Sequence, residues 1–96
     1  MGFLGKKVKQ PGETLDYDVD FTDWFSTRAD APSSFTVTAD TGLTEGTHVL
    51  NGNVVKVWLS GGTDGQQYQV NVKMTTTSGA VKEADFIVKV KAVGLG

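Results

Sequence analysis

The chain has 96 residues, no cysteine and a formal net charge of −2 at pH 7. This length fits a single domain, and the lack of cysteine excludes disulfides and thiolate metal sites, so packing alone must hold the fold. The acidic balance argues against nucleic acid as the main partner, and no apolar run approaches the roughly 18 residues that a membrane span needs.

Residues 1–12 place glycines and one proline around Lys6, Lys7 and Lys9, which predicts an N-terminal arm. Chain ends are usually mobile unless they are docked, so the arm is a candidate to order on a partner. Part of it could instead pair as a first edge strand, where a proline is tolerated. We expect one domain over residues 13–93 and a short C-terminal tail over 94–96.

Residues 14–21 alternate between an apolar and an acidic face, which indicates a half-buried strand. The two faces are Leu15, Tyr17, Val19 and Phe21, and Asp16, Asp18 and Asp20. The acidic face suits a solvated, aggregation-resistant surface or a docking surface for a basic neighbour. A calcium loop fits poorly, because its glycine and glutamate positions would hold Phe21 and Thr27.

The next segment breaks the alternation and predicts one helical turn, capped by Thr22 or Asp23. Trp24 and Phe25 are adjacent, so both cannot point inward from one strand. We expect one ring to plug the open end of the domain and the other to remain for a partner.

A second strand is predicted over residues 34–39, followed by a loop over 40–46. Strands over 47–50 and 54–59 then flank Asn51 and Gly52, a pair that favours a type I′ hairpin. Trp58 is out of phase with its apolar neighbours and should face outward, either as a partner anchor or half-buried under a loop. His48 is the only histidine, so neither zinc nor a catalytic triad is supported.

Residues 61–65 form a glycine-rich corner before a strand over 67–75 that opens with Tyr68. In immunoglobulin-like folds a tyrosine in this place packs its ring into the core while its hydroxyl bonds the backbone of the preceding corner. Asp64, Gly65 and Tyr68 are therefore predicted as a structural corner. With a last strand over 84–93, the pattern predicts an all-β, antiparallel, immunoglobulin-like β-sandwich of about seven strands.

Three segments resemble the phage fibre–tail adaptor family: residues 9–25 (KQPGETLDYDVDFTDWF), 57–68 (VWLSGGTDGQQY) and 75–79 (TTTSG). The similarity extends over residues 9–93. It implies a small structural protein in the tail or neck of a tailed bacteriophage or prophage, made in the host cytoplasm, with no enzymatic activity.

The resulting hypothesis is an adaptor that links tail components to fibres through protein–protein contacts, with copies joined in a ring. The contacts predicted from side-chain chemistry are Phe3, Leu4, Lys6, Lys7, Trp24, Phe25 and Trp58. The alternative is a β-sandwich module that binds host-surface carbohydrate, with Trp58 or Trp24 as a stacking platform. An enzyme ranks third, and no catalytic residue, substrate, cofactor or metal is predicted.

Overall fold

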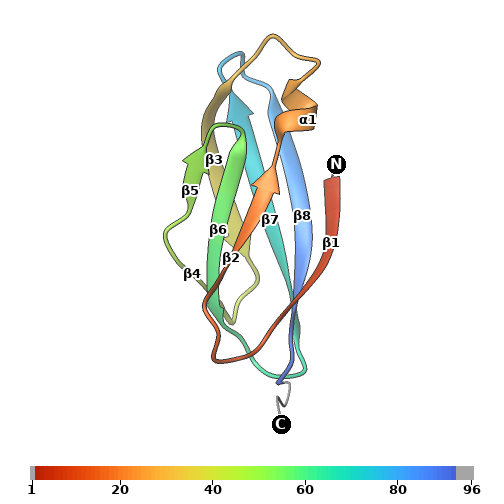
Figure 1. The fold of residues 1–96 in the computed structure, drawn as a ribbon, viewed down its shortest axis with the longest axis vertical. Helices are drawn as coiled ribbons and strands as arrows, with labels where there is room; N and C mark the ends of the chain where they lie inside the picture. Colours follow the sequence, from red (N-terminus) through yellow and green to blue (C-terminus); the bar gives the residue numbers. More distant parts are fainter. Residues whose placement is uncertain (1, 93–96) are drawn as a thin grey trace.

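The computed structural model describes residues 2–92, which form eight strands and one helical turn in two facing sheets (Figure 1). In chain order the elements are β1 (Gly2–Lys9), β2 (Leu15–Asp20), α1 (Thr22–Phe25), β3 (Pro32–Ala39), β4 (Leu43–Glu45), β5 (Val49–Asn51), β6 (Val54–Gly61), β7 (Gln67–Thr76) and β8 (Val81–Val90). The predicted all-β class is confirmed. Within residues 2–92, no helix has the length and apolar character needed to cross a bilayer. The predicted tail, residues 94–96, lies outside the described residues.

Sheet A has the strand order β1-β8-β7-β3, in which β1 runs parallel to β8 and the other neighbours are antiparallel. Sheet B has the order β2-β6-β4, and β5 also pairs with β6; all its pairs are antiparallel. The body is elongated, with extents of 50 × 20 × 19 Å. Figure 1 shows β1 and β2, each at the end of its sheet, along the same side of the sandwich.

The core lies between the sheets and follows the alternation of the sequence. The residues that are fully enclosed include Val55, Val57 and Leu59 on β6, Val70, Val72 and Met74 on β7, and Phe86, Val88 and Val90 on β8. Burying one such side chain contributes roughly 1.5–3 kcal/mol relative to leaving it exposed. Each of these three strands therefore buries every second residue on one face.

Two segments differ from the sequence prediction. Residues predicted as an arm lie in β1, whose Lys7 and Lys9 pair with Val88 and Val90 of β8, so the edge-strand alternative describes them better. The predicted loop over residues 40–46 is wrong in part, because β4 pairs with the end of β6. Only Leu43 is buried in this three-residue strand, so it shows no periodicity.

The hairpin between β5 and β6 is present, but its turn is shifted by one residue. Asn51 pairs with Val54, so the central turn residues are Gly52 and Asn53. Gly52 has a φ of 62°, and no non-glycine residue in the described part has a positive φ. One positive φ at the first central position is the pattern of a type II′ turn, so the predicted type I′ turn is wrong.

The helical turn α1 is present, but its predicted cap is wrong. Phe21 occupies the N-cap position and makes no side-chain capping bond. Instead, the backbone N–H of Thr22 donates to the carboxylate of Asp20 at 2.8 Å, so the last residue of β2 satisfies one of the free amides.

The carboxylate of Asp30 ties the segment before β3 to the turn between β7 and β8. It accepts hydrogen bonds from the hydroxyl of Ser78 at 2.6 Å, the hydroxyl of Thr77 at 2.9 Å and the N–H of Ala31 at 3.0 Å. Arg28 lies 3.6 Å from the same carboxylate. These donors, Ser78 foremost, hold the pKa of Asp30 well below its ordinary value of 3.8.

This network predicts a specific acid sensitivity. Because the folded-state pKa of Asp30 is depressed, its stabilising effect is present above pH 3.8 and is lost as the pH falls below that value. We expect Asp30→Asn to have a lower free energy of unfolding than the wild type at pH 7. At pH 3 the difference between the two proteins should be smaller. Urea denaturation at the two pH values measures this. An equal gap at both would contradict the network.

Candidate functional site

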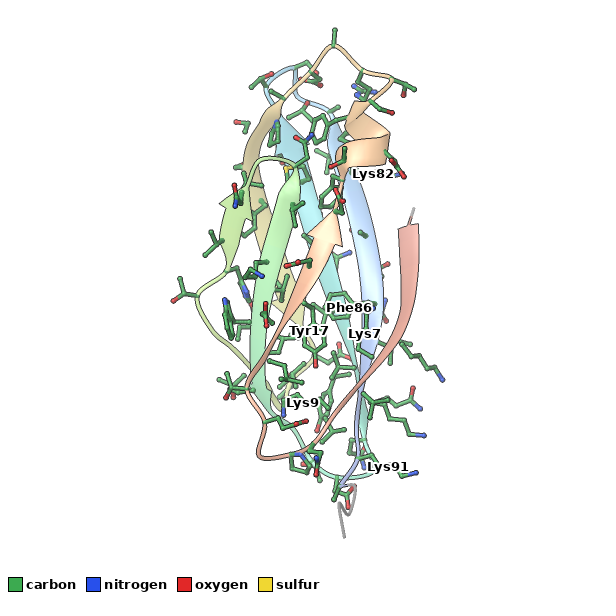
Figure 2. All side chains as sticks on the ribbon, in the orientation of Figure 1. Lys7, Lys9, Tyr17, Lys82, Phe86 and Lys91 are labelled. Carbon is green, nitrogen blue, oxygen red and sulfur yellow. The ribbon has the colours of Figure 1, made fainter. Side chains whose placement is uncertain are left out.

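The side of the sandwich where both sheets end carries a cavity of about 260 Å³. It is lined by Lys7 of β1, by Tyr17, Asp18, Val19 and Asp20 of β2, and by Phe86 of β8. Figure 2 shows Lys7, Tyr17 and Phe86 close together in this region. The fold thus brings a lysine of the predicted arm beside the acidic strand. We call this region, β1 and β2 with the cavity between them, the open edge.

The acidic face of β2 is only partly neutralised. The Lys56 ammonium of β6 lies 2.8 Å from a carboxylate oxygen of Asp16 and 3.0 Å from one of Asp18. The hydrogen bonds to Asp16 and Asp18 raise the pKa of Lys56, and the bond to Asp16 has the larger effect. The same bond from Lys56 lowers the pKa of Asp16. The hydroxyl of Thr22, and after it the N–H of the same residue, lower the pKa of Asp20. Lys56 pairs with two of the three exposed carboxylates on this face, so the face keeps a net negative charge.

The backbone of β2 is paired on one side. The N–H of Phe21 donates to the carbonyl of Asn53 at 2.8 Å, just beyond the ends of β2 and β6. In an antiparallel pair, successive residues point their backbone N–H and C=O groups alternately toward the partner strand and away from it. Because Phe21 bonds toward β6, the other odd-numbered residues of β2 also direct their backbone groups toward β6. The N–H and C=O groups of Asp16, Asp18 and Asp20 consequently point toward the open edge.

Tyr17 carries an unsatisfied polar group into the same region. Its ring packs 5.6 Å from the ring of Phe86. Among the side chains of the described residues, its hydroxyl is the buried polar atom that lacks a hydrogen-bond partner. Burial raises the pKa of Tyr17, with smaller contributions from nearby carboxylates. Buried hydroxyls without partners are uncommon in folded proteins.

Lys9 is the main residue that the sequence misplaced, because it was grouped with the exposed lysines of the arm. Its side chain is fully buried, with a relative exposure of 0%. The ammonium donates to the carbonyls of Gln10 at 2.7 Å and Gly61 at 2.6 Å, which connects the turn after β1 to the end of β6. Burial lowers the pKa of Lys9, while the nearby Glu13 carboxylate opposes this.

Trp24 and Phe25 lie in α1, directly after β2. Phe25 is buried in the core and Trp24 is half-buried against it, with their rings 4.9 Å apart in an edge-to-face arrangement. The guanidinium of Arg28 lies 4.9 Å from the centre of the Trp24 ring. One ring thus enters the core and the other stays partly accessible beneath a cation.

Trp58 lies on the outer face of sheet B and is half-buried, in agreement with its phase in the sequence. Its backbone falls between the parts of β6 that pair with β4 and with β5. The N–H of Gly46 donates to its carbonyl at 2.8 Å, and its own N–H donates to Nδ1 of His48 at 3.1 Å. His48 Nδ1 therefore carries no proton, and Nε2 donates to the carboxylate of Glu45 at 3.0 Å. His48 completes the edge of sheet B.

We expect His48→Ala to destabilise the domain by about 1 kcal/mol, because the N–H of Trp58 loses its acceptor in a partly buried place. Thr47→Ala is the matched control, since this neighbouring side chain is exposed. Denaturant titration of both variants measures the difference. Equal stability of the two variants would show that His48 contributes nothing to the sheet edge.

The corner between β6 and β7 is built around Tyr68. Its hydroxyl accepts a hydrogen bond from the N–H of Thr63 at 2.9 Å, the backbone contact that the sequence analysis expects. Gly42 and Gly62 approach the ring closely, because a Cβ built on either would lie 2.9 or 3.3 Å from a ring carbon. The carboxylate of Asp64 accepts a hydrogen bond of 2.9 Å from the N–H of Ala92, and this bond connects the corner to the chain after β8.

The residues predicted as partner contacts do not form one site. Lys6 and Lys7 are exposed on β1. Trp24 follows the end of β2, whereas Trp58 pairs with Asp16 near its beginning. The side chains of Phe3 and Leu4 lie outside the part of the chain that the structure describes. Within that part, no three His, Asp or Glu side chains gather as metal ligands.

A comparison with curated proteins found no match. The sequence of residues 9–89 matches the family described as "Podophage GP4 fiber-tail adaptor protein gp77". This match includes β2 to β7 in full and nearly all of β8, so it covers sheet B and all of sheet A except β1 before Lys9. The chain therefore belongs to the podophage GP4 fibre–tail adaptor family.

Proposed function

We propose that this chain is a non-enzymatic structural protein of a phage virion that links tail components to fibres by protein–protein contacts. The family match over residues 9–89 is the observation that supports this most strongly. In this proposal the protein is made in the host cytoplasm and joins the tail, where copies form a ring. Closed rings are a common outcome when identical subunits associate.

We also infer that the sandwich is immunoglobulin-like. In that fold one sheet holds strands C, F and G in order, and the other holds B, E and D. The order β3-β7-β8 in sheet A and β2-β6-β4 in sheet B corresponds to these two sets. The Tyr68 hydroxyl, bonded to Thr63 at the corner before the strand equivalent to F, supports the same assignment.

The candidate contacts are spread along β2. Trp58 lies opposite Asp16 at the start of this strand and Trp24 follows its end, so both adjoin the open edge. Exposed apolar side chains are also dispersed, with Val8 on β1, Val49 on β5 and Val81 on β8 between 46% and 58% exposed. Exposed apolar side chains that are scattered singly are normal on folded proteins, so these three valines mark no contact surface of their own.

The test is reconstitution of the tail and fibre proteins of the same phage with and without this chain. We expect a sedimenting complex of tail and fibre only when the chain is present. Fibres that attach to tails without it would refute the adaptor role. Saturable quenching of tryptophan fluorescence by a sugar, without co-assembly, would support the carbohydrate-binding alternative instead.

A further inference from the structure

We propose that the free side of β2 binds one extended segment of a neighbouring virion protein, in which basic residues alternate with small apolar ones. The segment would add to sheet B as a strand beside β2. This inference rests on the proposed adaptor function and deepens it, since it names the contact surface and the chemistry of the partner.

Among the edges of the two sheets, β2 is the best template for a new strand. Natural edge strands are usually protected by short length, bulges, proline or charged side chains, and of these β2 has only the charges of its three aspartates. The pairing of β1 shifts register between Phe3 and Lys6, β3 begins at Pro32 and shifts before Ser34, and β4 and β5 have three residues each. In contrast, β2 pairs over six residues without a shift. Its exposed backbone groups can therefore accept a regular strand.

The charge on β2 selects a basic partner. Asp16, Asp18 and Asp20 occupy the solvent face of the strand, and Lys56 pairs with the first two alone. Opposite charges directly across a strand pair are favourable, and like charges are unfavourable. The aspartates therefore disfavour pairing of β2 with an acidic strand or with the β2 of another copy, and they favour lysine or arginine at the facing positions.

The other face of the added strand would meet the 260 Å³ cavity, whose lining is mixed. Tyr17, Val19 and Phe86 supply apolar surface, and Lys7, Asp18 and Asp20 are charged. Figure 2 shows Lys7 beside Tyr17 and Phe86. Small apolar side chains would fill this space, and the positive charge of Lys7 disfavours a basic residue there.

A second copy of this chain fits the edge less well. Its basic strand β1 carries Lys6 and Lys7 at consecutive positions, so one lysine would face the aspartates and the other would face the cavity, where Lys7 already stands. The observations therefore favour a partner whose positive charges lie on one face alone.

The full chain, labelled with ¹⁵N, can be titrated with the peptide acetyl-TKVKVKT-amide. We expect saturable chemical-shift changes at the amides of Asp16, Asp18 and Asp20 and slower hydrogen exchange at the same three positions. The amides of Tyr17 and Val19 already donate to β6 and should keep their exchange rates. The peptide acetyl-TEVEVET-amide has the same pattern with the opposite charge and should not bind.

Variants of the chain test the charge selection. Asp18→Lys should weaken binding of the lysine peptide roughly tenfold or more, because like charges then face each other. Asp18→Asn, which keeps the shape of the side chain, should weaken it by a smaller factor. Glu83→Lys makes the same change in charge at an exposed position of sheet A and should leave the affinity unchanged. If Asp18→Lys and Glu83→Lys lost the same affinity for the lysine peptide, the assignment of the binding surface to β2 would be overturned.

The outcomes separate this inference from the adaptor role. If neither peptide binds but the chain still joins tail and fibre, the inference is wrong and the adaptor role stands. If the lysine peptide binds at β2 but no tail–fibre complex forms, the edge is a strand-binding site and the adaptor role is wrong. Protection of the three amides that rises with protein concentration, without peptide, would identify a second copy as the occupant and overturn the proposed partner.

Discussion

Gly62→Ala is expected to destabilise the domain by roughly 2–5 kcal/mol. Gly62 has a φ of +95°, where a side chain costs roughly 1–2 kcal/mol in backbone strain. A Cβ at this position would also lie 2.6 Å from a methyl carbon of Val90 and 3.3 Å from the ring of Tyr68. Forcing an extra carbon into a packed core costs roughly a further 1–3 kcal/mol. Thermal denaturation should show a fall of roughly 10 °C or more.

Gly65→Ala is the matched control for this prediction. Gly65 lies on the same corner with a φ of +88°, but a Cβ built there meets nothing within 4 Å. Its cost should be about 1 kcal/mol or less, because only the backbone strain remains and the unfolded chain loses some freedom. If both variants lost the same stability, close packing around Tyr68 would not be the cause.

Lys9→Ala is expected to destabilise the domain by roughly 3–5 kcal/mol. The substitution removes the largest fully buried side chain, and truncating a side chain of this length in a core typically costs roughly 2–5 kcal/mol. It also leaves the carbonyls of Gln10 and Gly61 without the hydrogen bonds that they accept from the Lys9 ammonium. Two unpaired carbonyls add a desolvation cost. Chemical denaturation monitored by tryptophan fluorescence measures the loss.

Two further variants separate the parts of this effect. Lys9→Met keeps most of the apolar stem and should recover part of the loss, leaving roughly 1–3 kcal/mol for the unpaired carbonyls. Lys7→Ala removes an exposed lysine of the same strand and should be nearly neutral. A neutral Lys9→Ala would show that the buried ammonium does not connect β1 to β6.

The strands that the sequence predicts well are those with one buried face. On β6, Val55, Val57 and Leu59 alternate with partly exposed residues, so a period of two identifies both the strand and its inward side. The outward position of Trp58 follows from the same pattern. Local alternation is sufficient here because neighbouring residues alone determine which side of a strand each one faces.

The features that the sequence missed depend on contacts between distant segments. Lys9 is buried because its strand pairs with β8 and its ammonium reaches the carbonyl of Gly61 at the end of β6, a contact between residues that are far apart in the sequence. Gly42 is required beside Tyr68 only because the sandwich brings the turn before β4 to the corner before β7. Residue type alone suggests an exposed lysine and an ordinary loop glycine at these two positions.

The candidate site was predicted in separate parts. The alternation of residues 14–21 predicts its acidic strand, and its lysines belong to the basic segment of residues 1–12. That Lys7 and Asp18 border one cavity could not be predicted, because it requires β1 to join the edge of sheet A while β2 ends sheet B. The unpartnered hydroxyl of Tyr17 likewise has no signature in a one-dimensional pattern.

The parallel pairing of β1 with β8 has a mechanical consequence. Gly2 lies opposite Ala84 and Lys9 opposite Val90, so the beginning of β1 and the end of β8 are at opposite ends of the shared ladder. Tension between the two termini would act along the strands and load all of their mutual hydrogen bonds together, instead of opening them one after another. Such a geometry resists rupture under force, a property useful wherever a small domain must carry load between larger bodies.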